Sequence, residues 1–107
     1  QGRLTTNSSL LLNLLIDGNN KISFVTKIEL LSHDEPDPEE AANRFLSNSI
    51  VFGVDESIIA KTILIRKENK IKLPDAIIAA TAIVNNLTLI TRNEKDFKNI
   101  SGLRWIN

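Results

Sequence analysis

The sequence contains no cysteine and no methionine, and only 5% of its 107 residues are aromatic. Without cysteine, disulfides and thiolate metal sites are both excluded, which fits a reducing compartment; we therefore expect a cytoplasmic protein. No apolar run approaches the ~20 residues that a membrane-spanning helix needs, so we expect no membrane partner. A basic segment followed by an apolar one, the signature of a signal peptide, is also missing.

Neither sign of charge is in excess, because 13 basic residues balance 13 acidic ones. This excludes a protein that coats nucleic acid through net charge alone, but not an enzyme that contacts RNA through a few basic side chains. The length predicts one domain over residues 1–107. Because the sequence starts at Gln1 and lacks methionine, we expect a processed, tagged or partial chain.

Strand and helix patterns alternate along the sequence. Short segments rich in apolar and β-branched residues predict strands over residues 22–26, 50–54, 87–91 and 103–106. Apolar periodicity and capping signals predict helices over residues 9–16, 39–46, 56–70 and 75–85, with Pro38 and Pro74 at favoured first-turn positions and Asp55 as a cap. This alternation predicts an α/β domain with a mainly parallel sheet.

Oxygen-bearing side chains follow the predicted strands. Glu29 comes three residues after Thr26, Asp75 lies in the first turn of an apolar helix, and Asn93 and Asp96 follow a strand that ends at Thr91. Ligands bind beyond the carboxyl ends of parallel strands, so we expect these side chains to converge. Crowded carboxylates are costly unless a cation offsets their charge. Mg²⁺ or Mn²⁺ held there would activate water for phosphodiester hydrolysis.

Each of these residues also has a purely structural interpretation. Asp75 would complement the dipole of its helix, and Glu29 would lie on an exposed helix face. Asn93 and Asp96 would be turn or capping residues. The residues alone therefore indicate an α/β domain with an acidic edge whose role stays open.

Three segments are similar to motifs of the PIN-domain family, which includes the VapC toxin ribonucleases. In chain order they are Val25-Thr26-Lys27-Ile28-Glu29-Leu30-Leu31, Leu73-Pro74-Asp75-Ala76-Ile77-Ile78-Ala79-Ala80-Thr81-Ala82 and Leu89-Ile90-Thr91-Arg92-Asn93-Glu94-Lys95-Asp96-Phe97. The likeness covers about Lys21 to Ile106. It implies a three-layer α/β/α sandwich and an endoribonuclease that depends on Mg²⁺ or Mn²⁺. Such proteins often bind an antitoxin and often form homodimers.

The resemblance also implies roles for single residues. Glu29 and Asp75 would be metal ligands, and Asn93 or Asp96 would occupy the region of the fourth acid, with Asp96 as a further ligand. Lys72, Arg92 and Lys95 would contact RNA phosphates.

One departure from the family concerns its first strand, which usually carries Asp-Thr-Asn. The nearest match here is Leu4-Thr5-Thr6-Asn7, with Thr5 in place of the aspartate and a short spacing to Glu29. Residues 1–7 are then a tag, a linker or a degenerate first strand. Since a parallel sheet buries its central strand on both faces, we expect either an incomplete sequence or a chain that swaps or borrows this strand.

The missing aspartate leaves a second function open. Loss of one carboxylate should cripple metal binding, so the alternative is a catalytically silent PIN-fold module that binds a protein partner or RNA. A small receiver-like binding domain is disfavoured, because the acid pair expected at the end of its first strand is absent.

Overall fold

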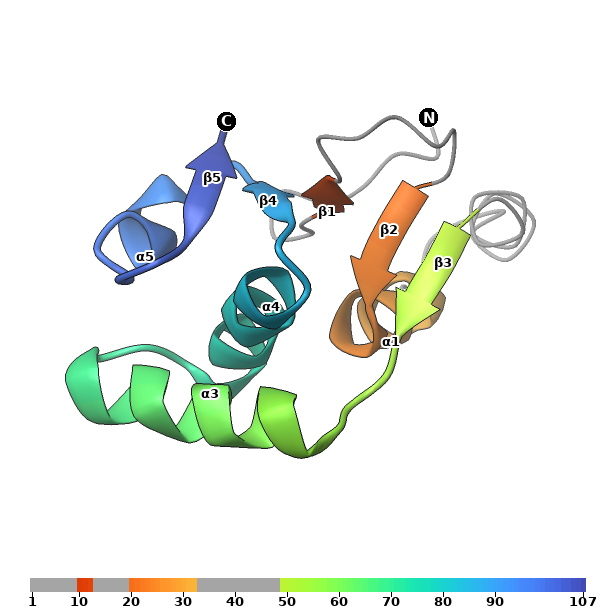
Figure 1. Ribbon diagram of the computed structural model, residues 1–107. Coiled ribbons are helices and arrows are strands. Elements are labelled where there is room, and N and C mark those ends of the chain that lie inside the picture. Colours follow the sequence, from red (N-terminus) through yellow and green to blue (C-terminus); the bar gives the residue numbers. More distant parts are fainter. Residues whose placement is uncertain (1–9, 13–19, 33–48) are drawn as a thin grey trace.

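The computed structural model describes residues 10–12, 20–32 and 49–107 (Figure 1). The strands in this part of the chain form one sheet in the order β3-β2-β1-β4-β5. They are β1 (Leu10–Leu12), β2 (Asn20–Ser23), β3 (Ser49–Phe52), β4 (Thr88–Ile90) and β5 (Arg104–Ile106). The helices are α1 (Phe24–Leu31), α3 (Glu56–Glu68), α4 (Leu73–Val84) and α5 (Glu94–Phe97). The predicted α/β class is confirmed.

The sheet has parallel pairs on both flanks and an antiparallel strand at its centre. β2 pairs with β3 and β4 pairs with β5 in the parallel sense that the sequence predicts. β1 runs antiparallel to both neighbours, with Leu11 opposite Lys21 of β2 and Leu10 opposite Ile90 of β4. The amino end of β1 therefore lies at the same edge of the sheet as the carboxyl ends of β2 and β4.

Two predictions near the N-terminus are wrong within the described residues. The leucine run was expected to be helical, but Leu10–Leu12 is a strand, because a short apolar run suits a buried strand as well as a helix. Residues 24–26 were expected to continue a strand, but α1 begins at Phe24. The Ser23 hydroxyl caps α1 by accepting a hydrogen bond from the Val25 N–H at 2.9 Å. Residues 1–7 and the helix predicted over 39–46 lie outside the described residues.

Helix α3 begins and packs as its sequence predicts. Asp55 is its N-cap, and the side-chain Oδ1 accepts a hydrogen bond from the Ile58 N–H at 2.9 Å. Ile58, Thr62 and Ile65 are buried, and their spacing places them on one face of the helix. None of the described helices is long and apolar enough to cross a membrane.

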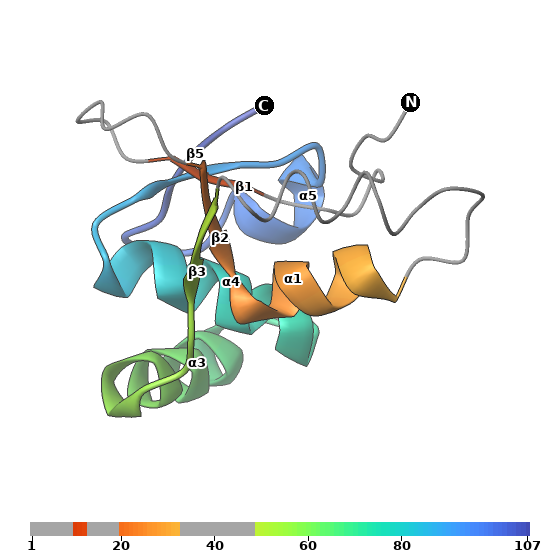
Figure 2. The same ribbon diagram turned by 90° about the vertical axis from the view of Figure 1, so that its right-hand side faces the viewer.

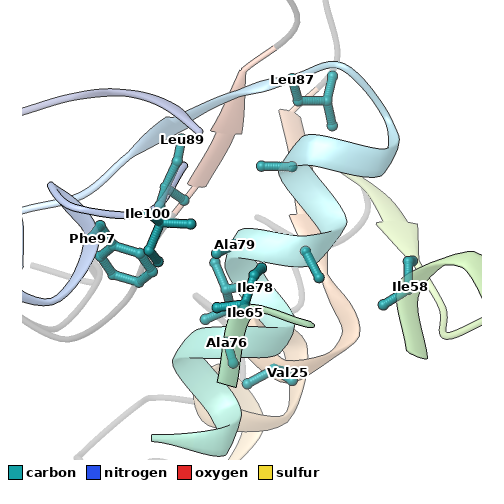
Figure 3. Packing of buried hydrophobic residues seen from close by; sticks show 12 residues of the cluster. Val25, Ile58, Ile65, Ala76, Ile78, Ala79, Leu87, Leu89, Phe97 and Ile100 are labelled. Atoms are coloured by element: carbon teal, nitrogen blue, oxygen red, sulfur yellow. The ribbon is translucent and has the colours of Figure 1, made fainter. Parts of the chain in front are cut away.

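Helix α4 lies at the centre of the core and contacts α1, α3, α5, β2 and β4. Six of its residues are buried, four of them alanines, so neighbouring elements approach its axis closely. Figure 3 shows Ile78 and Ala79 beside Leu89, Phe97 and Ile100. Pro74 occupies the first turn, as predicted. The first turn of α4, which carries Asp75, is thereby fixed between α1 and α5.

Candidate metal centre

The three candidate carboxylates lie on α4 and on two helices that contact it. Glu29 is on α1, which directly follows β2, and Asp96 is on α5, which follows β4 after a short turn. Figure 2 shows α1 leaving the end of β2 beside α4. The charge of Asp75 raises the pKa of Glu29, and the charge of Asp96 raises the pKa of Asp75. Burial is the larger cause of both upward pKa shifts, and the smaller effects indicate that Asp75 lies near Glu29 and near Asp96.

Glu29 holds one carboxylate oxygen in an unusual environment. Its Oε1 is buried and has no hydrogen-bond partner among the described residues. Burial is the main cause that raises the pKa of Glu29, and the neighbouring Asp75 adds to it. Buried carboxylate oxygens normally accept hydrogen bonds or bind cations, because desolvation is otherwise uncompensated. Among the described residues, Glu29 Oε1 therefore has neither the exposure nor the hydrogen bonds of an ordinary surface acid.

Asp75 is held in the first turn of α4, immediately after Pro74. Burial raises the pKa of Asp75 most, and Asp96 raises it further. Lys72, the exposed N-cap residue of α4, acts in the opposite direction, so its ammonium group lies near the carboxylate. The helix dipole alone would favour ionised Asp75, yet its pKa moves upward, because burial, with Asp96 adding to it, outweighs the dipole.

Asn93 and Asp96 form a direct pair at the start of α5. The Asn93 side-chain Nδ2 donates a hydrogen bond to Asp96 Oδ2 at 2.7 Å. The Asn93 backbone N–H donates to the Thr91 hydroxyl at 3.0 Å. Asn93 thus contacts Asp96 through its amide and fixes one of the two carboxylate oxygens.

These residues fit a hard divalent cation, but as an open site. Carboxylate oxygens are the ligands that Mg²⁺ and Mn²⁺ prefer. Within the part of the chain that the structure describes, no three acidic, histidine or cysteine side chains gather closely enough to hold an ion. Mg²⁺ is often bound by one or two carboxylates and keeps several waters, so Glu29 and Asp75 would be its protein ligands at such a site. Asp96 adds negative charge beside them.

The predicted RNA-binding residues surround this edge of the molecule. Lys72 precedes α4, Arg92 lies in the turn between β4 and α5, and Lys95 is on α5 next to Asp96. All three are exposed. Lys95 is the sequence neighbour of Asp96, and Lys72 lies three residues before Asp75.

Two polar residues of this region were missed in the sequence. Ser23 is fully buried and caps α1, the helix of Glu29. Thr91 is 3% exposed and binds the Asn93 N–H. Thr91 stands at the end of a predicted strand, directly before a turn, which was its signal, whereas Ser23 lay inside the strand predicted over residues 22–26 and gave no such signal.

A family model for the PIN domain matches residues 8–103, which is most of the chain. The chain belongs to the PIN-domain family. This match begins after Leu4-Thr5-Thr6-Asn7, so the segment compared above with Asp-Thr-Asn lies outside it. The part of β1 that the match includes, Leu10–Leu12, brings no carboxylate to this PIN domain's site.

Solved structures similar to this PIN domain are toxin–antitoxin complexes. A chain of a complex from Klebsiella pneumoniae is 35% identical, with a TM-score of 0.73 over 86% of this chain and 76% of that chain. A chain of a VapBC complex from Rickettsia felis, bound to a DNA fragment from its promoter, is 27% identical, with a TM-score of 0.70 over 79% of this chain and 71% of that chain. A chain of a DNA-bound VapBC complex from Salmonella typhimurium is 27% identical, with a TM-score of 0.71 over 80% of this chain and 73% of that chain. No curated protein matches the chain.

Proposed function

We propose that this PIN domain is a VapC-like toxin that hydrolyses RNA phosphodiester bonds as a Mg²⁺- or Mn²⁺-dependent endoribonuclease. The buried Oε1 of Glu29, close to Asp75 and without a hydrogen-bond partner among the described residues, carries this proposal. A carboxylate that serves only the fold is normally paired. Acids whose pKa values are raised by burial and by a neighbouring acid are typical of functional sites.

The chain's own residues have distinct roles in this proposal. Glu29 and Asp75 hold the divalent ion, and Asp96 strengthens the negative potential that attracts it. When bound, the ion supplies an activated water and stabilises the charge that develops on the phosphate. Asn93 belongs to the site through its hydrogen bond to Asp96. Lys72, Arg92 and Lys95 position the RNA by contacts with its phosphates.

We also propose an antitoxin protein as the partner, a homodimer as the assembly and the cytoplasm as the compartment. The similar structures from three bacteria are complexes of toxin with antitoxin, which supports a protein partner. A nuclease that attacks RNA in its own cell requires such control. The absence of cysteine fits a reducing compartment.

Cleavage of a mixed, structured RNA by the purified chain tests this function. We expect cleavage with Mg²⁺ or Mn²⁺, none with EDTA, and none by Asp75→Asn with its fold intact. Glu68→Gln is the matched control, because it neutralises an exposed acid at the far end of α3. Cleavage that persists in EDTA, or that Asp75→Asn leaves unchanged, contradicts the proposal.

One observation favours a second candidate, a catalytically silent PIN-fold module that binds RNA or a protein. Strand β1 (Leu10–Leu12) begins at the edge where the carboxylates gather and contributes no acid. A silent module remains folded, binds no Mn²⁺ and cleaves no RNA, yet retains its partner. A Mn²⁺ titration of the folded chain therefore distinguishes the two functions.

A further inference from the structure

We propose that Thr91 is a positioning residue of the acidic site: acting through Asn93, it fixes the carboxylate of Asp96 beside Asp75. The geometry stands on its own, and only its consequence for metal binding rests on the proposed function. Thr91 touches neither the ion nor the substrate in this proposal. It acts by tying a mobile surface carboxylate to the sheet.

Thr91 is itself firmly attached to the sheet. It follows the last residue of β4 and is 3% exposed. Its backbone N–H donates to the carbonyl oxygen of Ile106 in β5 at 3.0 Å, which extends the pairing of these strands. The hydroxyl of Thr91 is therefore presented from a rigid element.

Two hydrogen bonds in series connect this hydroxyl to Asp96. The backbone N–H of Asn93 donates to Thr91 Oγ1 at 3.0 Å. The side-chain Nδ2 of Asn93 then donates to Asp96 Oδ2 at 2.7 Å. Asp96 is exposed, so without these bonds its side chain would sample several rotamers. The series leaves the second carboxylate oxygen, Oδ1, available to other groups.

The opposite side of the site is equally fixed. Asp75 belongs to α4, which packs against both β4 and α5. Phe97, the residue after Asp96, is 1% exposed and lies in the core. The separation of the two carboxylates is thus set through the sheet and the core. Thr91 and Asn93 thus orient an acid that adds negative charge beside the proposed ligands.

Mn²⁺ affinity measures the consequence. We expect Thr91→Val and Asn93→Ala each to weaken Mn²⁺ binding by roughly two- to fivefold, the effect of one exposed charge beside the proposed ligands Glu29 and Asp75. Because the two bonds act in series, the double variant should bind no more weakly than the weaker single variant. Thr91→Ser, which keeps the hydroxyl, should restore the affinity.

Thr88→Val is the matched control. Thr88 is also buried and lies on β4, but its hydroxyl accepts a 3.4 Å hydrogen bond from Arg104 Nε instead. We expect no change in Mn²⁺ affinity. Additive losses of affinity in the double variant would overturn the inference, because they indicate that the two residues act independently. An equal loss of affinity in Thr88→Val would also overturn it, because it indicates a general loosening of the fold.

Amide exchange in the metal-free chain tests the geometry separately. We expect the Asn93 amide proton to exchange about tenfold faster in Thr91→Val, as loss of one hydrogen bond implies, and at the normal rate in Thr91→Ser and Thr88→Val. Unchanged exchange of the Asn93 amide in Thr91→Val overturns the inference, irrespective of the Mn²⁺ affinities.

Absence of Mn²⁺ binding by the unaltered chain refutes the proposed function alone. If Thr91→Val does not fold, the motion of the Asp96 side chain in Asn93→Ala is measured instead. Faster reorientation of this side chain supports the two hydrogen bonds in series, and unchanged reorientation overturns the inference.

Discussion

Glu29 and Asp75, which are 46 residues apart in the sequence, place their carboxylates close enough for Asp75 to raise the pKa of Glu29. The Oε1 of Glu29 is at the same time buried and, among the described residues, without a hydrogen-bond partner. Ionised acids in such a place oppose folding. The metal-free chain therefore carries a local instability that a bound cation would remove.

Glu29→Gln should stabilise the metal-free chain at neutral pH. A raised pKa means that the folded chain binds the Glu29 proton more tightly than the unfolded chain, so ionisation lowers stability as pH rises above the ordinary value of 4.5. We expect a midpoint of thermal unfolding higher by roughly a few degrees, since the group is partly exposed and its charge is screened. The gain should fade on acidification and vanish below pH 4.5.

Thermal unfolding in EDTA across this pH range measures the effect, with Glu68→Gln as control. Glu68 is exposed, so neutralising it should leave the pH dependence of stability unchanged. A gain for Glu29→Gln that is the same at acidic and neutral pH would point to packing instead of charge. No gain at neutral pH would contradict the burial of an ionised Glu29.

Arg92→Ala and Lys95→Ala should weaken RNA binding without changing metal affinity. Each removes one positive charge that we expect to face a phosphate, so each should raise KM and reduce the salt dependence of binding by about one ion. Filter binding at several salt concentrations measures this slope. Lys98→Ala, a change at the exposed C-cap of α5, is the control. Equal effects of all three variants would indicate unspecific attraction.

Asp55→Ala should separate stability from activity. Asp55 caps α3 through its 2.9 Å hydrogen bond, and loss of such a cap typically costs about 1 kcal/mol. Because α3 carries none of the candidate ligands, Mn²⁺ affinity should not change. Urea unfolding and a Mn²⁺ titration of the same variant check both statements. A drop in affinity would show that α3 supports the site more closely than its position suggests.

The sequence predicted the C-terminal half of the fold well, because its signals there are local and strong. Asp55 caps α3, and Pro74 stands in the first turn of a helix too apolar to be exposed. The N-terminal errors arose where the signals conflict. The leucine run has no periodicity that separates a buried strand from a helix, and Phe24-Val25-Thr26 has high β-propensity. The cap at Ser23 decided in favour of α1.

The composition of the candidate site was predictable, but its internal connections were not. Glu29 and Asp96 lie on the helices that follow strands β2 and β4, and Asp75 lies in the first turn of α4, which contacts both helices. The burial of Glu29 Oε1 depends on how α1 packs, which no local pattern encodes. The bond between Asn93 and Asp96 depends on α5, a four-residue helix too short for a periodic signal.

A Mn²⁺ titration of the folded, metal-free chain tests the central claim most directly, with Asp75→Asn and Glu68→Gln measured beside it. We predict one Mn²⁺ site whose occupation raises the midpoint of thermal unfolding, because a ligand that binds only the folded state stabilises it. Glu68→Gln should behave as the unaltered chain does, and Asp75→Asn should lose the site. A folded chain that binds no Mn²⁺, or binds it equally well after Asp75→Asn, contradicts a metal centre at Glu29 and Asp75.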